Sequence, residues 1–167
     1  MTKIFRYLAA ITMILLAASA TASAQEYTHG NGALELFDNE GVANSPAWVR
    51  AWVFIMLGAF ALGLLFVWKR LEARVVVGGF ILGIVSMILL QSAFGIPPLS
   101  GFIALMHLIF WTPGLILLLQ RRTFLSERSL YGAWTGLMTF VILFSFVFDI
   151  RDAAIYLDHI AGTGLLS

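Results

Sequence analysis

Cysteine is absent from this chain of 167 residues. Its absence excludes disulfides, cysteine-ligated zinc or iron–sulfur centres and thiol nucleophiles. Charged residues are also scarce, at 11% of the chain, and no basic cluster resembles the footprint of a nucleic-acid-binding protein. Serine elbows, phosphate loops, zinc-protease histidine pairs and dinucleotide-binding glycine motifs are missing as well. We therefore expect no nucleic-acid partner, and no motif implies a cofactor.

Hydrophobic residues make up 60% of the sequence. A soluble domain has an apolar share of about 45–50%, and a soluble fold could not cover the larger apolar surface of this chain. The apolar residues also gather in blocks of roughly 20, the length that crosses a hydrocarbon layer about 30 Å thick. The composition predicts an integral membrane protein whose main partner is the lipid bilayer.

The start of the chain, over 1–24, has the three parts of a secretory signal peptide. Lys3 and Arg6 supply the positive start, residues 7–18 the apolar run, and Ala22-Ser23-Ala24 a site with small residues. We expect cleavage before Gln25, which exports the segment that follows.

The remaining pattern predicts an all-α membrane protein, a four-transmembrane-helix bundle after a cleaved signal peptide. The bundle covers residues 47–149, with spans at 48–68, 75–93, 99–119 and 130–148. An external arm over 25–46 precedes it, and we expect this arm to be a solvated leader rather than a turn or strand against the bundle. An external amphipathic helix and tail over 150–167 follow it.

Basic residues set the orientation. Six of the eight Lys and Arg residues after position 24 lie in the two hairpins at 69–74 and 121–128. Cytoplasmic loops carry such an excess of Lys and Arg, so both hairpins are predicted to face the cytoplasm. The signal peptide gives the same orientation independently. We expect a multi-pass protein of a bacterial-type inner (plasma) membrane, with both mature termini on the periplasmic or extracellular side.

Small residues four apart place glycines on one helix face, where helix backbones can approach closely in lipid. Such pairs are Gly79 with Gly83 and Gly132 with Gly136. We expect them to pack helices within the chain, with a dimerisation seam as the alternative.

His107 is the one strongly titratable residue near the middle of a predicted span. Ionisable residues in the bilayer are costly there and mark functional hypotheses. His107 could relay protons, hold a metal or haem, or bind a quinone; the alternative is a neutral histidine with one structural hydrogen bond. Pro113 is expected to kink the same helix. Gln91 is a second intramembrane polar candidate, expected to be structural.

The pattern of the segment after the fourth span predicts an amphipathic helix. Its carboxylates and histidine could bind a divalent cation, with Asp149, Asp152 and His159 as metal candidates, or the face could dock a partner or meet water. At the end of an apolar span, Asp149 needs a counter-charge, and Arg50 or Arg151 is expected to supply it. The external polar face comprises Asp149, Arg151, Asp152, Tyr156 and His159.

Three function classes stay open. An accessory, assembly or scaffolding subunit explains the lack of catalytic motifs and the short cytoplasmic loops, and it implies a protein partner or a homo-oligomer. An oligomeric transporter or channel for protons or small ions would use His107. An intramembrane or interfacial enzyme would assemble its site on the external side.

Overall fold

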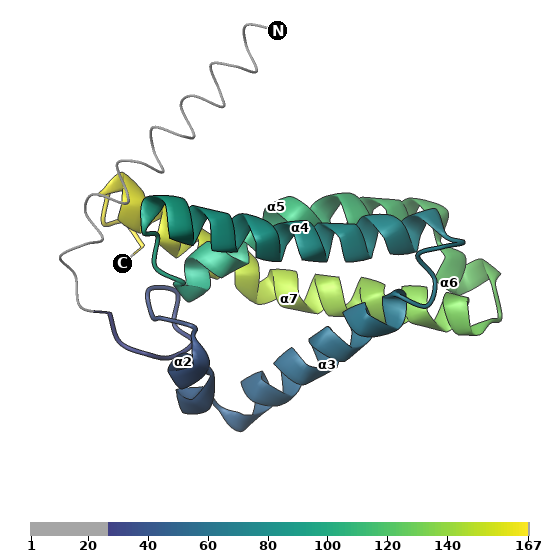
Figure 1. The fold of residues 1–167 in the computed structure, drawn as a ribbon, viewed down its shortest axis with the longest axis horizontal. Helices are drawn as coiled ribbons and strands as arrows, with labels where there is room; N and C mark the ends of the chain where they lie inside the picture. The colour runs from purple at the N-terminus through teal and green to yellow at the C-terminus, as the bar shows by residue number, and fades with distance from the viewer. Residues whose placement is uncertain (1–26, 167) are drawn as a thin grey trace, which may run out of the picture.

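The structure, a computed structural model, describes residues 27–166 (Figure 1), so the predicted signal peptide lies outside the described residues. Within residues 27–166 the chain is helical, and its only β-type pairings are isolated bridges. The helices are α2 (Asn39–Asn44), α3 (Ala47–Gly63), α4 (Leu71–Phe94), α5 (Ser100–Arg121), α6 (Thr123–Ser126) and α7 (Leu130–Ala161).

Three helices, α4, α5 and α7, run side by side as the body of the molecule (Figure 1). Each is long and apolar enough to cross a membrane, as expected of a multi-pass membrane protein. The fourth, α3, has 17 residues. At about 1.5 Å per residue it covers roughly 26 Å, less than a hydrocarbon core of about 30 Å. The structure therefore supports three of the four predicted spans by length.

The predicted first span ends too late. We expected a helix over 48–68, but α3 ends at Gly63 and the chain continues in tight turns, with the Phe66 N–H donating to the Gly63 carbonyl at 2.9 Å. A Cβ at Gly63 would lie 2.7 Å from side-chain atoms of both Trp134 and Val77. Gly63 is thus the point where α3 meets α7 and α4, and from there α3 diverges from the body (Figure 1).

Ionic contacts join the two hairpins at the end of the molecule near α6. Arg70 donates two hydrogen bonds to Glu127, at 2.9 and 3.0 Å, and lies 4.3 Å from the ring centroid of Tyr131. Glu72 is buried and accepts a hydrogen bond from the Thr123 hydroxyl at 3.3 Å. Because bidentate Arg–carboxylate pairs are geometrically specific, they fix the register of the two hairpins.

The fourth predicted span and the amphipathic segment after it form one continuous helix. Ser129 caps the N-terminus of α7 by accepting from the Gly132 N–H at 3.1 Å, and Gly162, at φ 66°, ends it. The 32 residues of α7 would cover about 48 Å, more than a hydrocarbon core. Its C-terminal turns therefore extend past the length that a bilayer requires.

The arm is not the solvated leader that we expected. The Phe37 N–H donates to the Pro98 carbonyl at 2.9 Å, and the Gly101 N–H donates to the Ala33 carbonyl at 2.8 Å. Leu36 packs with buried residues of α5 and α7. The physical reason is that the arm satisfies the backbone groups at the start of α5, which a helix N-terminus leaves unpaired.

The paired glycines lie at contacts within the chain. A Cβ at Gly79 would overlap the Phe110 carbonyl oxygen of α5, and one at Gly132 would overlap the Glu127 carbonyl oxygen of the preceding loop. Gly83 has more room, with Phe110 side-chain atoms 3.7 Å from a Cβ, and Gly136 faces Phe124 at 3.3 Å. This geometry agrees with packing inside one chain.

Candidate functional site: a pocket between α3, α5 and α7

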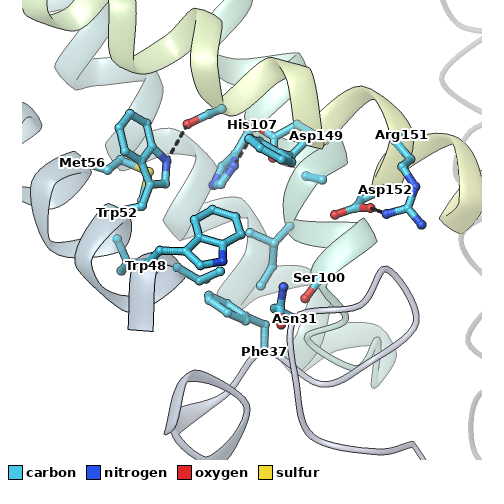
Figure 2. Close-up of a pocket in the computed structure, with 16 residues that line it drawn as sticks. Asn31, Phe37, Trp48, Trp52, Met56, Ser100, His107, Asp149, Arg151 and Asp152 are labelled. Carbon is cyan, nitrogen blue, oxygen red and sulfur yellow. Dashed lines mark hydrogen bonds and ion pairs between the residues drawn. The ribbon is translucent and has the colours of Figure 1, made fainter. Parts of the chain in front are cut away.

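A pocket of about 360 Å³ occupies the space where α3 diverges from the body (Figure 2). Its walls come from α3, α5 and α7, and the arm contributes Asn31 and Phe37 at the rim. Most of the lining is apolar, with a few polar groups among it. Small-molecule sites in proteins have this character, with volumes of about 300–1,000 Å³.

His107 and Asp149 form a pair inside the pocket (Figure 2). The His107 Nδ1 and Asp149 Oδ2 atoms are 3.2 Å apart, and the two side chains are 19% and 14% exposed. The imidazole stacks on Trp111 with ring centroids 3.8 Å apart. Because a carboxylate oxygen accepts the Nδ1 proton, the neutral imidazole has its lone pair on Nε2. The pair can accept a hydrogen bond or a proton from a bound group.

The partner of Asp149 differs from the expected one. Arg50 donates instead to the backbone carbonyls of Ala43, at 3.0 Å, and Ser45, at 2.6 Å. It thereby pairs carbonyls at the C-terminus of α2, an arrangement that stabilises a helix end. Arg151 contacts its neighbour Asp152 at 3.3 Å. Neither arginine pairs with Asp149. Its partner is His107, on the antiparallel neighbour α5.

The polar residues of the C-terminal segment point in different directions. Asp152 and Arg151 line the pocket, although the Arg151 side chain is 76% exposed. Tyr156 is buried, and its ring packs against Phe102 at a centroid distance of 5.8 Å. His159 lies in the last turn of α7 and does not line the pocket.

The proposed metal ligands are not brought together. Asp149 and Asp152 share the pocket, but His159 is elsewhere. Among residues 27–166, no group of three or more carboxylate or histidine side chains is placed to hold a metal ion. Two carboxylates alone are fewer ligands than a protein site for a divalent cation normally offers.

Aromatic side chains join α3 to α7 along one wall. Trp48 lies 5.8 Å from Phe148, and Trp52 lies 4.4 Å from Phe144, measured between ring centroids. The Trp52 indole N–H also donates to the Ser145 hydroxyl at 3.3 Å. Trp48 and Trp52 are four positions apart and so share one face of α3.

The pocket ends on an apolar floor. Trp111, below His107, is 2% exposed, and its ring lies 5.0 Å from that of Phe60, which is also 2% exposed. Phe60 in turn stacks on Phe80 of α4 at 4.3 Å. These rings belong to the main buried cluster of the bundle. The pocket is therefore closed toward the hairpins.

The other intramembrane candidates lie away from the pocket. Gln91, on α4, is not among its lining residues. Pro113 lies within α5, which runs through it as one helix, and the Thr112 hydroxyl donates to the Leu108 carbonyl beside it. Such a bond to a backbone carbonyl pairs a polar group locally.

The arm carries its own charged pair near the pocket rim. The His29 Nδ1 and Asp38 Oδ1 atoms are 3.0 Å apart. The hydrogen bond to Asp38 raises the pKa of His29 above its ordinary value. Backbone hydrogen bonding from Gly41, followed by the His29 contact, lowers the pKa of Asp38. Asp38 also accepts from the Glu40 N–H as the N-cap of α2, so one carboxylate fixes both the helix and the arm.

Sequence reasoning missed two parts of this site. It did not use the spacing of Trp48 and Trp52, which places both on one helix face. It also placed Asp149 at the end of the fourth span. The available signal was the position of each residue along its helix. Helix α7 continues beyond Asp149 to Ala161, and the antiparallel α5 starts at Ser100, about two turns before His107, so the two residues lie at a similar level.

Comparisons with other proteins do not indicate a function for this chain. No protein-family profile, curated protein or solved structure matches this chain. Function is therefore argued from the geometry and chemistry of the pocket.

Proposed function

We propose that this protein is an accessory subunit of a membrane complex, and that it holds a small amphipathic molecule in the pocket between α3, α5 and α7. The observation that carries this proposal is the pocket itself: an apolar, aromatic wall with one hydrogen-bonding pair at its base. Such a wall takes up the apolar part of a molecule, while the few polar groups fix its orientation.

The closed floor supports binding rather than conduction through one chain. Below His107 the largest buried side chains between the helices are apolar or aromatic, led by Trp111 and Phe60. The buried hydroxyls of Thr135 and Thr139 donate to backbone carbonyls of their own helix. A solute or proton path would need polar groups or water along its length, because charge is costly in such an interior. A molecule that enters the pocket is therefore held there.

The accessory role rests on two further features. The connections between α3 and α4, at 64–70, and between α5 and α7, at 122–129, are too short to form a soluble catalytic domain. The folded arm and the C-terminal turns of α7 lie together at the pocket end (Figure 1), where they offer a surface outside the apolar body. These features support a subunit that positions a bound molecule for a partner.

Proton transfer is the second candidate, and the His107–Asp149 pair favours it. An imidazole held by a carboxylate can accept a proton on Nε2 and release it again. A transport role would require a route past Trp111, in an oligomer or in another conformation. Proton flux in reconstituted vesicles that disappears in His107→Gln would replace binding with transport as the function.

Native mass spectrometry after gentle extraction tests the proposal. We expect the protein to carry a small molecule and a partner subunit. In Ile103→Trp, a larger side chain fills the pocket, so the small molecule should be lost while the partner stays bound. The matched control is Ile109→Trp on the same helix, because Ile109 is exposed and does not line the pocket. If both variants retain the small molecule equally, the proposal is contradicted.

A further inference from the structure

The chemistry of the pocket specifies its occupant, on the premise that the proposed binding function holds. We infer that the pocket takes an organic cation, an amine or ammonium group that carries an apolar tail. Two carboxylates, an electron-rich aromatic wall and the charge distribution of the chain each point to a cation.

The first observation is the pair of carboxylates on one face of α7. Asp149 and Asp152 are three positions apart and therefore neighbours on the helix surface. Their side chains are only 14% and 19% exposed, so both are partly removed from water. Arg151, the one cationic lining residue besides the histidine, is 76% exposed, and its guanidinium donates to Asp152 at 3.3 Å (Figure 2). The formal charges of the two carboxylates and the one guanidinium sum to −1.

The second observation is the aromatic wall. Trp48 and Phe37 lie opposite the His107–Asp149 pair across the pocket (Figure 2). The face of an aromatic ring carries negative charge, and tryptophan attracts a cation most strongly. Rings combined with carboxylates bind ammonium groups by cation–π attraction and charge pairing together. Neither feature favours an anion, which both the rings and the carboxylates repel.

The third observation is the charge of the whole pocket end. Residues 27–50 and 149–166 carry six carboxylates and two arginines, whereas residues 69–74 and 121–128 carry two carboxylates and six basic residues. The first two segments lie at the pocket end of the molecule and the other two at the opposite end (Figure 1). The negative field at the pocket end raises the local concentration of cations.

The apolar wall accounts for the tail. A small hydrophilic cation would leave Ile103, Met56 and Val53 facing an unfilled space, because these side chains line the pocket. A short alkyl or ring group buries them, and each buried methylene adds to affinity. An ammonium lipid headgroup and a free amphipathic amine share this chemistry.

Calorimetric titration of the full chain in lipid nanodiscs tests the inference. The probes are hexyltrimethylammonium, hexanol and hexanoate, which share a chain length and differ in charge. We expect saturable binding of the cation, binding of hexanol at least about tenfold weaker, and no saturable binding of hexanoate. Empty nanodiscs correct for partition into lipid.

Two substitutions locate the effect. Asp152→Asn should weaken cation binding by about tenfold, whereas Glu40→Gln, an equal change of charge outside the pocket, should leave it within about twofold. Trp48→Leu keeps an apolar wall but removes the indole. It should also weaken binding of the cation, without weakening binding of hexanol. Its control is Trp68→Leu, because Trp68 is 88% exposed and does not line the pocket.

The outcomes separate the inference from the function beneath it. Hexanol or hexanoate binding as tightly as the cation, in a manner that Ile103→Trp abolishes, would overturn the cation assignment and leave the binding pocket standing. If the probes bind Ile103→Trp with the same affinity as the wild type, both the cation assignment and the binding pocket are overturned. Nanodiscs with and without phosphatidylethanolamine distinguish a lipid headgroup from a free amine as the natural occupant. If the lipid ammonium is the occupant, phosphatidylethanolamine should compete with the probe and weaken its apparent binding. If a free amine is the occupant, the titration should be the same in both kinds of nanodisc.

Discussion

A histidine and a carboxylate in the pocket-end half of an apolar bundle are tolerated because each is the partner of the other. The imidazole of His107 gains a hydrogen bond to Asp149 and a stacking contact with Trp111. An ionisable group in a membrane-spanning segment is expensive without such partners. Their position in a pocket, rather than inside the closed core, leaves the imidazole able to meet a ligand.

The charged pair of the arm gives a prediction about pH. The pKa of His29 lies above 6.5 because Asp38 accepts a hydrogen bond from the imidazole. The contact therefore stabilises the arm while the imidazole is protonated, and this stabilisation is lost as pH rises through the raised pKa. Because the pKa of Asp38 is lowered, its contribution is lost only as pH falls through that lowered pKa.

Titration of His29 by NMR checks this assignment. Asp38→Asn should return the pKa of His29 toward 6.5, and asparagine remains a good N-cap, so α2 is kept. Glu40→Gln is the control, because Glu40 lies farther away, at 3.8 Å, and should move the pKa less. An unchanged His29 pKa in Asp38→Asn would show that the two side chains do not pair in solution.

Among the helices, the body of the molecule depends on close contacts between α4 and α5. Gly79 lies against the Phe110 carbonyl, a backbone atom that cannot move aside without displacing α5. In lipid, small residues of this kind allow helix backbones to pack, since lipid tails offer no hydrophobic driving force between helices. Gly83, one turn further along α4, has room for a methyl group.

These two glycines form a matched pair for a stability measurement. Gly79→Ala should lower the free energy of unfolding by about 1–3 kcal/mol, because the added methyl group forces α4 and α5 apart. Gly83→Ala should be close to neutral, since its Cβ would be in ordinary contact with the Phe110 side chain. Thermal unfolding in detergent, followed by circular dichroism, compares them. Equal losses in both variants would contradict the contact geometry.

Helix α3 differs from the other long helices in its attachment. It meets the body near Gly63 and along the aromatic wall at Trp48 and Trp52, and the pocket lies between these attachments and α5. It is also shorter than α4, α5 or α7. Helix α3 thus ends where it meets the body, and the pocket lies where the rest of α3 diverges from it.

The two ends of the molecule differ in charge, and this difference predicts which end faces the cytoplasm. The hairpins hold six basic residues and are expected to face the cytoplasm. The arm, α2 and the C-terminus gather at the opposite end (Figure 1). Residues of the arm and of the C-terminal half of α7 line the pocket there. The pocket is therefore expected to open on the periplasmic or extracellular side.

The absence of cysteine makes this orientation directly measurable, because a single introduced cysteine is the only thiol in the chain. Leu165→Cys and Leu125→Cys place it at opposite ends, at side chains that are 82% and 73% exposed. A membrane-impermeant maleimide should label Leu165→Cys in intact spheroplasts and Leu125→Cys only after permeabilisation. The reverse pattern would place the pocket in the cytoplasm and overturn the topology.

The order of amino acids was enough to predict the helical class and the apolar blocks, although the first connection between helices begins earlier than predicted, at 64. Helix α4, predicted at 75–93, is observed at Leu71–Phe94, and α5, predicted at 99–119, is observed at Ser100–Arg121. Such blocks are readable because hydropathy and helix length are local properties, set by the medium and by the constant rise of an α-helix per residue.

Which polar groups meet could be learned from the folded chain alone. His107 lies on α5 and Asp149 on α7, and no local pattern links them. Their contact follows from the antiparallel packing of α5 on α7 and from the depth at which each helix starts. The folding of the arm and the divergence of α3 have the same origin, because each depends on backbone pairing or close approach between distant segments. The site exists where those long-range contacts leave a space.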